Sequence, residues 1–150
     1  MVFVAASSAQ TKPLLTLTTE DGKTTNFTSA DLAKIKLVTV KATEHGTAAT
    51  FEGVPLVAVL KAGGVVFGEP LRGKRLASYL LVMSSDGYRI VFALPELDPG
   101  FTDKLIILAD ARDGKPLDAK AGPLQIVVPD EKRPARWARM VTSLKIVAAP

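Results

Sequence analysis

Continuous and alternating runs of apolar residues recur along the chain and are separated by short turn sequences. Two continuous runs, residues 76–83 and 105–109, predict buried central strands, because an unbroken apolar run needs both faces of its sheet covered. Shorter or alternating runs, bounded by glycine, proline or polar residues, predict further strands. These lie at residues 13–18, 23–27, 37–42, 48–51, 88–93, 124–128 and 144–147.

Two segments carry helix signals. Ser29 is a suitable N-cap for a short helix over residues 30–35, and Asp31 in its first turn favours the helix dipole. Pro55 fits the first position of a second helix, which ends before Gly63-Gly64. Strands outnumber helices, and the two do not alternate regularly. The chain is therefore predicted to be an α+β protein with a mostly antiparallel or mixed β-sheet and few short helices.

The first ten residues differ from the rest of the chain. Residues 1–10 join a short apolar stretch to Ser7-Ser8-Ala9, as at the cleavage region of a secretory signal. The positively charged start of such a signal is absent, so the segment is interpreted as a residual leader. We therefore expect a single domain over residues 11–150 of an exported protein, periplasmic or secreted. No apolar run has the length of a membrane span, so none is expected.

Composition narrows the chemistry. Hydrophobic residues make up 47% of the chain and charged residues 23%, which is typical of a globular protein. The net charge of +4 is modest and partly local to residues 132–139, which favours an anionic ligand over a nucleic acid. The absence of cysteine excludes disulfides, thiolate nucleophiles and cysteine-held metal clusters. The single histidine, His45, cannot build a metal site unaided.

The segment 132–139 places four cations around one indole, that of Trp137. Arginine gives permanently charged, bidentate recognition of phosphate-like anions, and an indole can stack on a guanidinium or a heterocycle. Because strands are predicted on both sides of this loop, it is a candidate receptor for a small anion. A second interpretation stays open, in which Trp137 packs in the core and the arginines are solvated.

Several spaced motifs point to a known family. The sequence has DGKPL at residues 113–117, GPLQIVVP at 122–129, and a basic residue directly before Trp137. In this order, followed by a closing strand, they resemble the molybdopterin-binding domain of the sulfite oxidase family. The resemblance is strongest over residues 79–146 and weaker over 51–64, where FEGVPLVAVLKAGG fits the family's helix. It implies a sulfite oxidase molybdopterin-domain-like fold, a pterin-type cofactor and oxidoreductase chemistry.

The resemblance also implies site residues. Arg133 and Arg136 fall where the family places cations near its cofactor. Tyr88, after a tight Asp-Gly turn, resembles the family's tyrosine beside the metal, although any β-hairpin would use the same turn. The resemblance brings these three residues to one rim of a concave pocket. His45 lies in the shortened loop where the family carries its metal-binding thiolate, and it is either a ligand-binding residue or merely exposed.

Two departures from the family bear on function. The molybdenum-binding cysteine is missing, and Gln125 stands where the family carries an arginine. The preferred hypothesis is therefore a domain without bound molybdenum that binds a small anion or a protein partner, with ligand-binding residues His45, Tyr88, Arg133, Arg136 and Trp137. One alternative is an active molybdopterin-dependent oxidoreductase. A second is a nucleic-acid or anionic-surface binder acting through residues 132–139. No catalytic residue or metal ligand is assigned.

Overall fold

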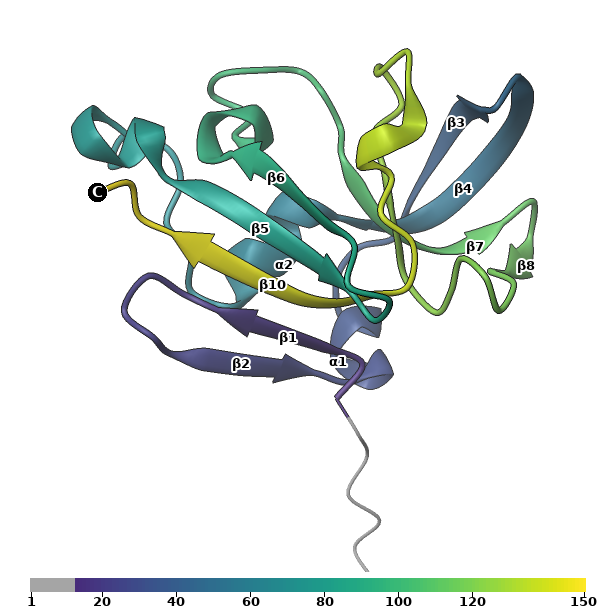
Figure 1. Ribbon diagram of the computed structural model, residues 1–150, viewed down its shortest axis with the longest axis horizontal. Coiled ribbons are helices and arrows are strands. Elements are labelled where there is room, and N and C mark those ends of the chain that lie inside the picture. Colours follow the sequence, from purple (N-terminus) through teal and green to yellow (C-terminus); the bar gives the residue numbers. More distant parts are fainter. Residues whose placement is uncertain (1–12) are drawn as a thin grey trace, which may run out of the picture.

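The computed structural model describes residues 13–150, whose strands form two five-stranded sheets. The first sheet has the order β2-β1-β10-β5-β6, and in Figure 1 it occupies the front of the molecule. Its pairings are antiparallel except for β1 with β10, which run parallel with Thr16 opposite Ser143. The strands are β1 (Leu15–Thr18), β2 (Thr24–Phe27), β5 (Tyr79–Ser84), β6 (Arg89–Ala93) and β10 (Val141–Val147).

The second sheet has the order β3-β4-β7-β8, with β9 also paired to β7. All of its pairings are antiparallel, and the β3–β4 and β7–β8 hairpins extend to the right in Figure 1. With two mostly antiparallel sheets and few helices, the α+β fold class is confirmed. The strands are β3 (Val38–Glu44), β4 (Thr47–Pro55), β7 (Ile107–Arg112), β8 (Lys115–Pro116) and β9 (Gln125–Val127).

Within residues 13–150, five short helical segments connect the strands. In α2, which lies behind the first sheet in Figure 1, the side chains of Leu56, Val59 and Leu60 are fully buried. The N-cap of α1 is Thr28 and not Ser29, because the Thr28 hydroxyl accepts the Asp31 N–H while the Asp31 carboxylate accepts the Thr28 N–H. The segments are α1 (Ser29–Ala33), α2 (Leu56–Ala62), η1 (Gly73–Ala77), η2 (Leu94–Leu97) and η3 (Pro134–Arg136).

One hydrophobic core joins both sheets and α2. Residues 106–109 and 124–128 are buried without a break, so buried strands are confirmed in these two segments. β7 is central as predicted, because it pairs with β4, β8 and β9, but Leu105 is 38% exposed and lies before the strand. The prediction for residues 76–83 was wrong in part. The strand begins at Tyr79 and its burial alternates, with Leu80 fully buried and Leu81 only half-buried. The reason is that successive side chains point to opposite faces, and only one face of this sheet packs on the core.

The described part of the chain does not reach the leader-like segment. Residues 1–10 lie outside it, so the division into a leader and a domain over residues 11–150 stays a prediction. Among residues 13–150, no helix combines the length and the apolar character that crossing a membrane requires.

Candidate functional site

Trp137 anchors the basic loop to the core. Its side chain is 3% exposed, its indole N–H donates to the Val128 carbonyl at 3.1 Å, and its ring meets Phe51 edge-on at 5.8 Å between centroids. The indole is therefore held by the core, as the second interpretation of this loop proposed. The small exposed part of Trp137 helps to line a hollow at the surface.

Arg136 is engaged by carboxylates. Its guanidinium forms ion pairs with Glu96, at 3.0 Å, and with Glu131, and it lies 4.4 Å from the centre of the Phe92 ring. Burial opposes the charged form of Arg136, but hydrogen bonds to Glu131 and Glu96 outweigh it and raise the pKa. Burial likewise acts to raise the pKa of Glu96, yet the hydrogen bonds from Arg136 and the Ala93 N–H lower it overall. Two carboxylates thus already balance the charge of Arg136.

Tyr88 and Arg133 do not join Arg136 in a common rim. The Tyr88 side chain is 47% exposed, and its hydroxyl donates to the Ala135 carbonyl in η3, in the middle of the basic loop. Its backbone N–H donates to the Asp86 carboxylate at 3.0 Å, which shapes the turn before β6. Arg133 is exposed and precedes η3. The expected pocket rim of Tyr88, Arg133 and Arg136 is therefore not formed, because Arg136 turns to Glu96 and Glu131.

Three of the five predicted residues do meet in one hollow. His45, Tyr88 and Trp137 line a depression of about 240 Å³, named here the tyrosine hollow. His45 sits in the two-residue turn between β3 and β4 with φ of 50°, followed by Gly46 with φ of 79°. The remaining lining residues are Glu44, Asp86, Pro134, Ala135 and Arg139.

A second pocket, named here the arginine pocket, adjoins the tyrosine hollow. It has a volume of about 420 Å³ and shares Glu44 and Arg139 with the hollow. At the shared wall, Glu44 is 5% exposed and accepts from Arg139 at 2.6 Å and from Arg112 at 3.3 Å. The full lining is Glu44, Arg112, Asp113, Lys115, Pro116, Leu117, Asp118, Lys120, Ala121, Gln125 and Arg139.

Gln125 gives this pocket an unused donor. Its side chain is 1% exposed and lines the pocket, and its Nε2 has no hydrogen-bond partner among residues 13–150. A buried polar group without a partner costs about 1–3 kcal/mol, so native structures rarely leave one in place. Because the nitrogen itself is buried in the pocket wall, a small movement of the side chain would let it donate to an acceptor oxygen in the pocket. The pocket therefore combines an amide donor with several cations, a set that suits an oxyanion.

The sequence held a partial signal for this pocket. Gln125 is a polar residue inside an apolar strand, and buried polar side chains normally require a partner. In the resemblance to the family, Gln125 is only a departure from the pattern. Glu44, Arg112 and Arg139 were not predicted as a group, since 68 and 95 residues separate Glu44 from its two partners.

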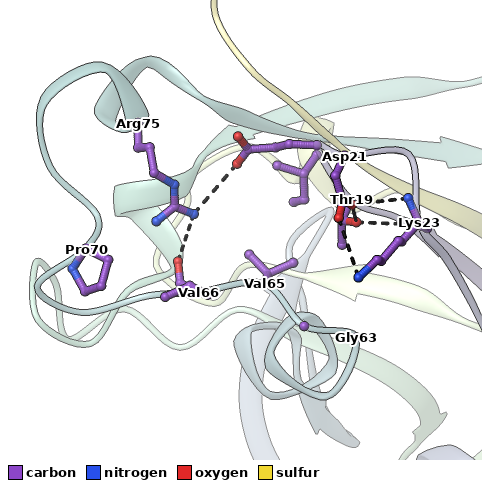
Figure 2. A pocket seen from close by; sticks show the side chains of 11 residues that line it. Thr19, Asp21, Lys23, Gly63, Val65, Val66, Pro70 and Arg75 are labelled. Carbon is purple, nitrogen blue, oxygen red and sulfur yellow. Dashed lines mark hydrogen bonds and ion pairs between the residues drawn. The ribbon is translucent and has the colours of Figure 1, made fainter.

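A further pocket of about 470 Å³ lies between the β1–β2 turn, the end of α2 and η1 (Figure 2). In it, Arg75 donates to the Val66 carbonyl at 2.9 Å and lies 3.7 Å from Glu20. Its charged groups are engaged with one another, and none of the predicted site residues lies there.

The residues present do not fit a molybdenum centre. The sequence contains no cysteine, and residues 13–150 hold no cluster of three or more histidine, aspartate or glutamate side chains able to bind a metal. Near the loop where the resemblance places the thiolate, the structure has Glu44, whose carboxylate is bound by two arginines. A carboxylate is a hard ligand, and this one is already bound by two cations, so it does not replace the soft thiolate.

Comparisons with known proteins show a likeness of fold. No protein-family model and no curated protein matches the sequence. Among solved structures, the chain is similar to a chain in the crystal structure of the sulfane dehydrogenase SoxCD from Paracoccus pantotrophus, with a TM-score of 0.68 and 20% identity. The match covers 89% of this chain and 37% of that chain, so this protein spans a little over a third of its neighbour's length. At this identity the likeness shows the fold alone, and that fold is consistent with the sulfite oxidase-like domain expected from the motifs.

Proposed function

We propose that this protein is a domain of the sulfite oxidase-like fold that works without molybdenum and binds a small anion in the arginine pocket. The observation that carries the proposal is the buried amide of Gln125, whose donor faces no acceptor among residues 13–150. It lies in a pocket with two arginines, and charge-assisted hydrogen bonds from arginine to an oxyanion are among the stronger ones in proteins.

The charges around the pocket support an anionic ligand. Four cations and three carboxylates line it. Two of the carboxylates serve the backbone: Asp113 accepts the Thr50 N–H at 2.9 Å, and Asp118 accepts the Ala121 N–H at 2.9 Å. Glu44 faces both arginines, and Asp113 also lies 4.0 Å from Arg112, but with three carboxylates against four cations the positive charge is only partly balanced. Inorganic phosphate and sulfate are suitable probes.

The tyrosine hollow extends this site. Because Glu44 and Arg139 line both depressions, a ligand held by its anionic end in the arginine pocket can reach towards Tyr88 and His45. Tyr88 and His45 were both predicted as ligand-binding residues, and here they would contact the end of the ligand that lies away from its anionic group. Arg136 would not bind the ligand, because its charge is already paired with Glu96 and Glu131.

The test is thermal unfolding in phosphate or sulfate, with chloride adjusted to hold ionic strength constant. A ligand that binds only the folded state stabilises it by about 2.7 kcal/mol at one hundred times its Kd, so the midpoint should rise with ligand concentration. Gln125→Leu removes the donor at nearly constant volume and should abolish the rise. Arg133→Gln removes an exposed cation outside the pocket lining and should leave the rise intact. A wild-type midpoint that does not respond to either anion contradicts the proposal.

Metal analysis separates this proposal from an active molybdopterin oxidoreductase. Molybdenum prefers a soft protein ligand, and this sequence offers no thiolate. Protein purified from a host that makes the cofactor should therefore contain far less than one molybdenum per chain. A stoichiometric content would favour the enzyme instead.

Export of the protein, inferred from residues 1–10, is part of the proposal and is tested by sequencing the N-terminus of the mature protein.

A further inference from the structure

Glu44 lies where an anion bound in the arginine pocket would be expected. It is the last residue of β3, and its carboxylate is buried between Arg112 on β7 and Arg139 after η3. Arg112 is also held over the Phe51 ring, with its guanidinium carbon 5.4 Å from the ring centre. Two guanidinium groups from distant parts of the chain thus converge on one carboxylate.

The pocket keeps a net positive charge, because four cations line it against three carboxylates. Glu44 is hydrogen-bonded to both arginines, and Asp113 lies 4.0 Å from the Nε of Arg112, yet each guanidinium has five N–H donors, of which few are taken up. Two arginines brought together repel each other unless an anion lies between them. The side chain of Glu44 supplies that anion from within the chain, in the place where phosphate or a ligand carboxylate would bind most strongly.

We propose that Glu44 is a resident competitor, whose carboxylate occupies the anion position between Arg112 and Arg139 and thereby limits the affinity of the pocket. This inference rests on the proposed function, since it concerns the same pocket. It assigns Glu44 a regulatory role: a ligand binds tightly only if its anionic group displaces this carboxylate. The pocket thus selects ligands with high anionic charge over weakly charged ones.

The position of Glu44 allows it to leave. It lines both the arginine pocket and the tyrosine hollow, so space lies on either side of its side chain. The two-residue turn of His45 and Gly46 follows it directly, which places it at the end of a hairpin. Displacement therefore requires a side-chain movement at a hairpin end and no rearrangement of the core.

The opposite role predicts the opposite sign. If Glu44 only positions the arginines for the ligand, removing its charge leaves them disordered and weakens anion binding. If Glu44 competes, removing its charge frees Arg112 and Arg139 and strengthens binding, although the unliganded protein becomes less stable. The two effects of one substitution, on affinity and on unliganded stability, therefore distinguish the roles.

The experiment is calorimetric titration of phosphate into wild type, Glu44→Gln and Glu69→Gln, with folding verified by circular dichroism. Glu44→Gln should bind phosphate about tenfold more tightly than wild type, because the arginines gain an unopposed partner. Glu69→Gln makes the same change in net charge at an exposed site outside the pocket and should leave the affinity unchanged. Glu44→Asp, which keeps the charge but shortens its reach, should give a smaller gain and serves if Glu44→Gln does not fold.

The outcomes separate the two proposals. If wild type binds phosphate and the Glu44 variants bind it equally or more weakly, anion binding stands and the competitor role is overturned. If wild type does not bind but Glu44→Gln does, Glu44 occupies the site and the proposed function of the native chain is overturned. If neither protein binds phosphate, both proposals are wrong. Tighter binding by Glu44→Gln over a measurable wild-type affinity supports both.

Discussion

Arg136 and Glu96 form an ion pair that covers the outer edge of β6. β6 is the last strand of its sheet, so alternate backbone groups on its outer side have no partner strand. Arg136 donates to the Val91 carbonyl at 3.0 Å, and Glu96 accepts the Ala93 N–H at 2.8 Å. The two side chains, 3.0 Å apart, thus satisfy two outward-facing backbone groups and block the edge against further strands.

This edge role predicts that Arg136 stabilises the unliganded protein. Arg136→Ala leaves Glu96, Glu131 and the Val91 carbonyl without their shared donor, at a site that is about a third exposed. We expect the free energy of unfolding in urea to fall by about 1–2 kcal/mol, less than for a fully buried pair because solvent screens the charges. Arg133→Ala, an exposed arginine of the same loop, should change it by less than about 0.5 kcal/mol. Equal effects of the two substitutions would refute the edge role.

The sequence was informative about elements whose causes are local. The apolar runs at residues 105–109 and 124–128 hold the buried strands β7 and β9, apart from the exposed Leu105, and Pro55 and Gly63 flank α2, with Pro55 as the N-cap one residue before the expected position. In these segments, the preference of each residue agrees with its surroundings in the fold. The prediction for residues 76–83 was wrong in part, because a continuous apolar run does not reveal that one face of the strand is only half-buried.

The site depended on contacts that no local pattern contains. Arg136 was expected to face a ligand, and it pairs instead with Glu131, five residues away, and with Glu96, 40 residues away along the chain. The pairing with Glu96 depends on how β6 and η2 are placed beside the loop, and the sequence of the loop does not contain that information. Gln125 was the exception, since a polar side chain in a buried strand already signals a polar requirement.

The N-cap of α1 offers a test between neighbouring residues. The Thr28 hydroxyl accepts the Asp31 N–H at 3.2 Å, whereas Ser29 is already in the first turn of the helix. Thr28→Ala should lower the free energy of unfolding by about 0.5–2 kcal/mol, as is usual for a lost N-cap. Ser29→Ala should have little effect, because alanine is a better helix former. A larger loss from Ser29→Ala would restore the cap expected from sequence alone.

Leu80 and Leu81 test the one-sided burial of β5. They are adjacent on one strand, but Leu80 is fully buried while Leu81 is only half-buried. Leu80→Ala removes core contacts and should cost about 2–5 kcal/mol, and Leu81→Ala should cost less than half as much. Chemical denaturation of both variants with a common m-value provides the comparison. If the two losses are equal, both faces of β5 are buried, as the apolar run at residues 76–83 predicted.

Asp98 links the loop between α2 and η1 to the turn that follows η2. The stability that this link contributes should depend on pH. Its side chain is 3% exposed, and its two carboxylate oxygens accept the N–H groups of Gly68 and Gly100, each at 2.9 Å. These two hydrogen bonds favour the charged form and lower the pKa of Asp98 below its ordinary value of 3.8. Asparagine can offer only one acceptor oxygen, so Asp98→Asn leaves one backbone N–H without its acceptor.

Asp98→Asn should therefore lower the free energy of unfolding by about 1–3 kcal/mol at neutral pH. Because the pKa of Asp98 is lowered on folding, its stabilising effect is complete above 3.8 and is lost as the pH falls through the lower value of the folded state. Urea unfolding of wild type and Asp98→Asn between pH 7 and pH 2 should show the gap between them narrowing below about pH 4. Asp103→Asn, at an exposed position of the same segment, should alter the neutral-pH value by less than about 0.5 kcal/mol. A gap for Asp98→Asn that stays constant down to pH 2 would show that its carboxylate charge contributes nothing to the folded state.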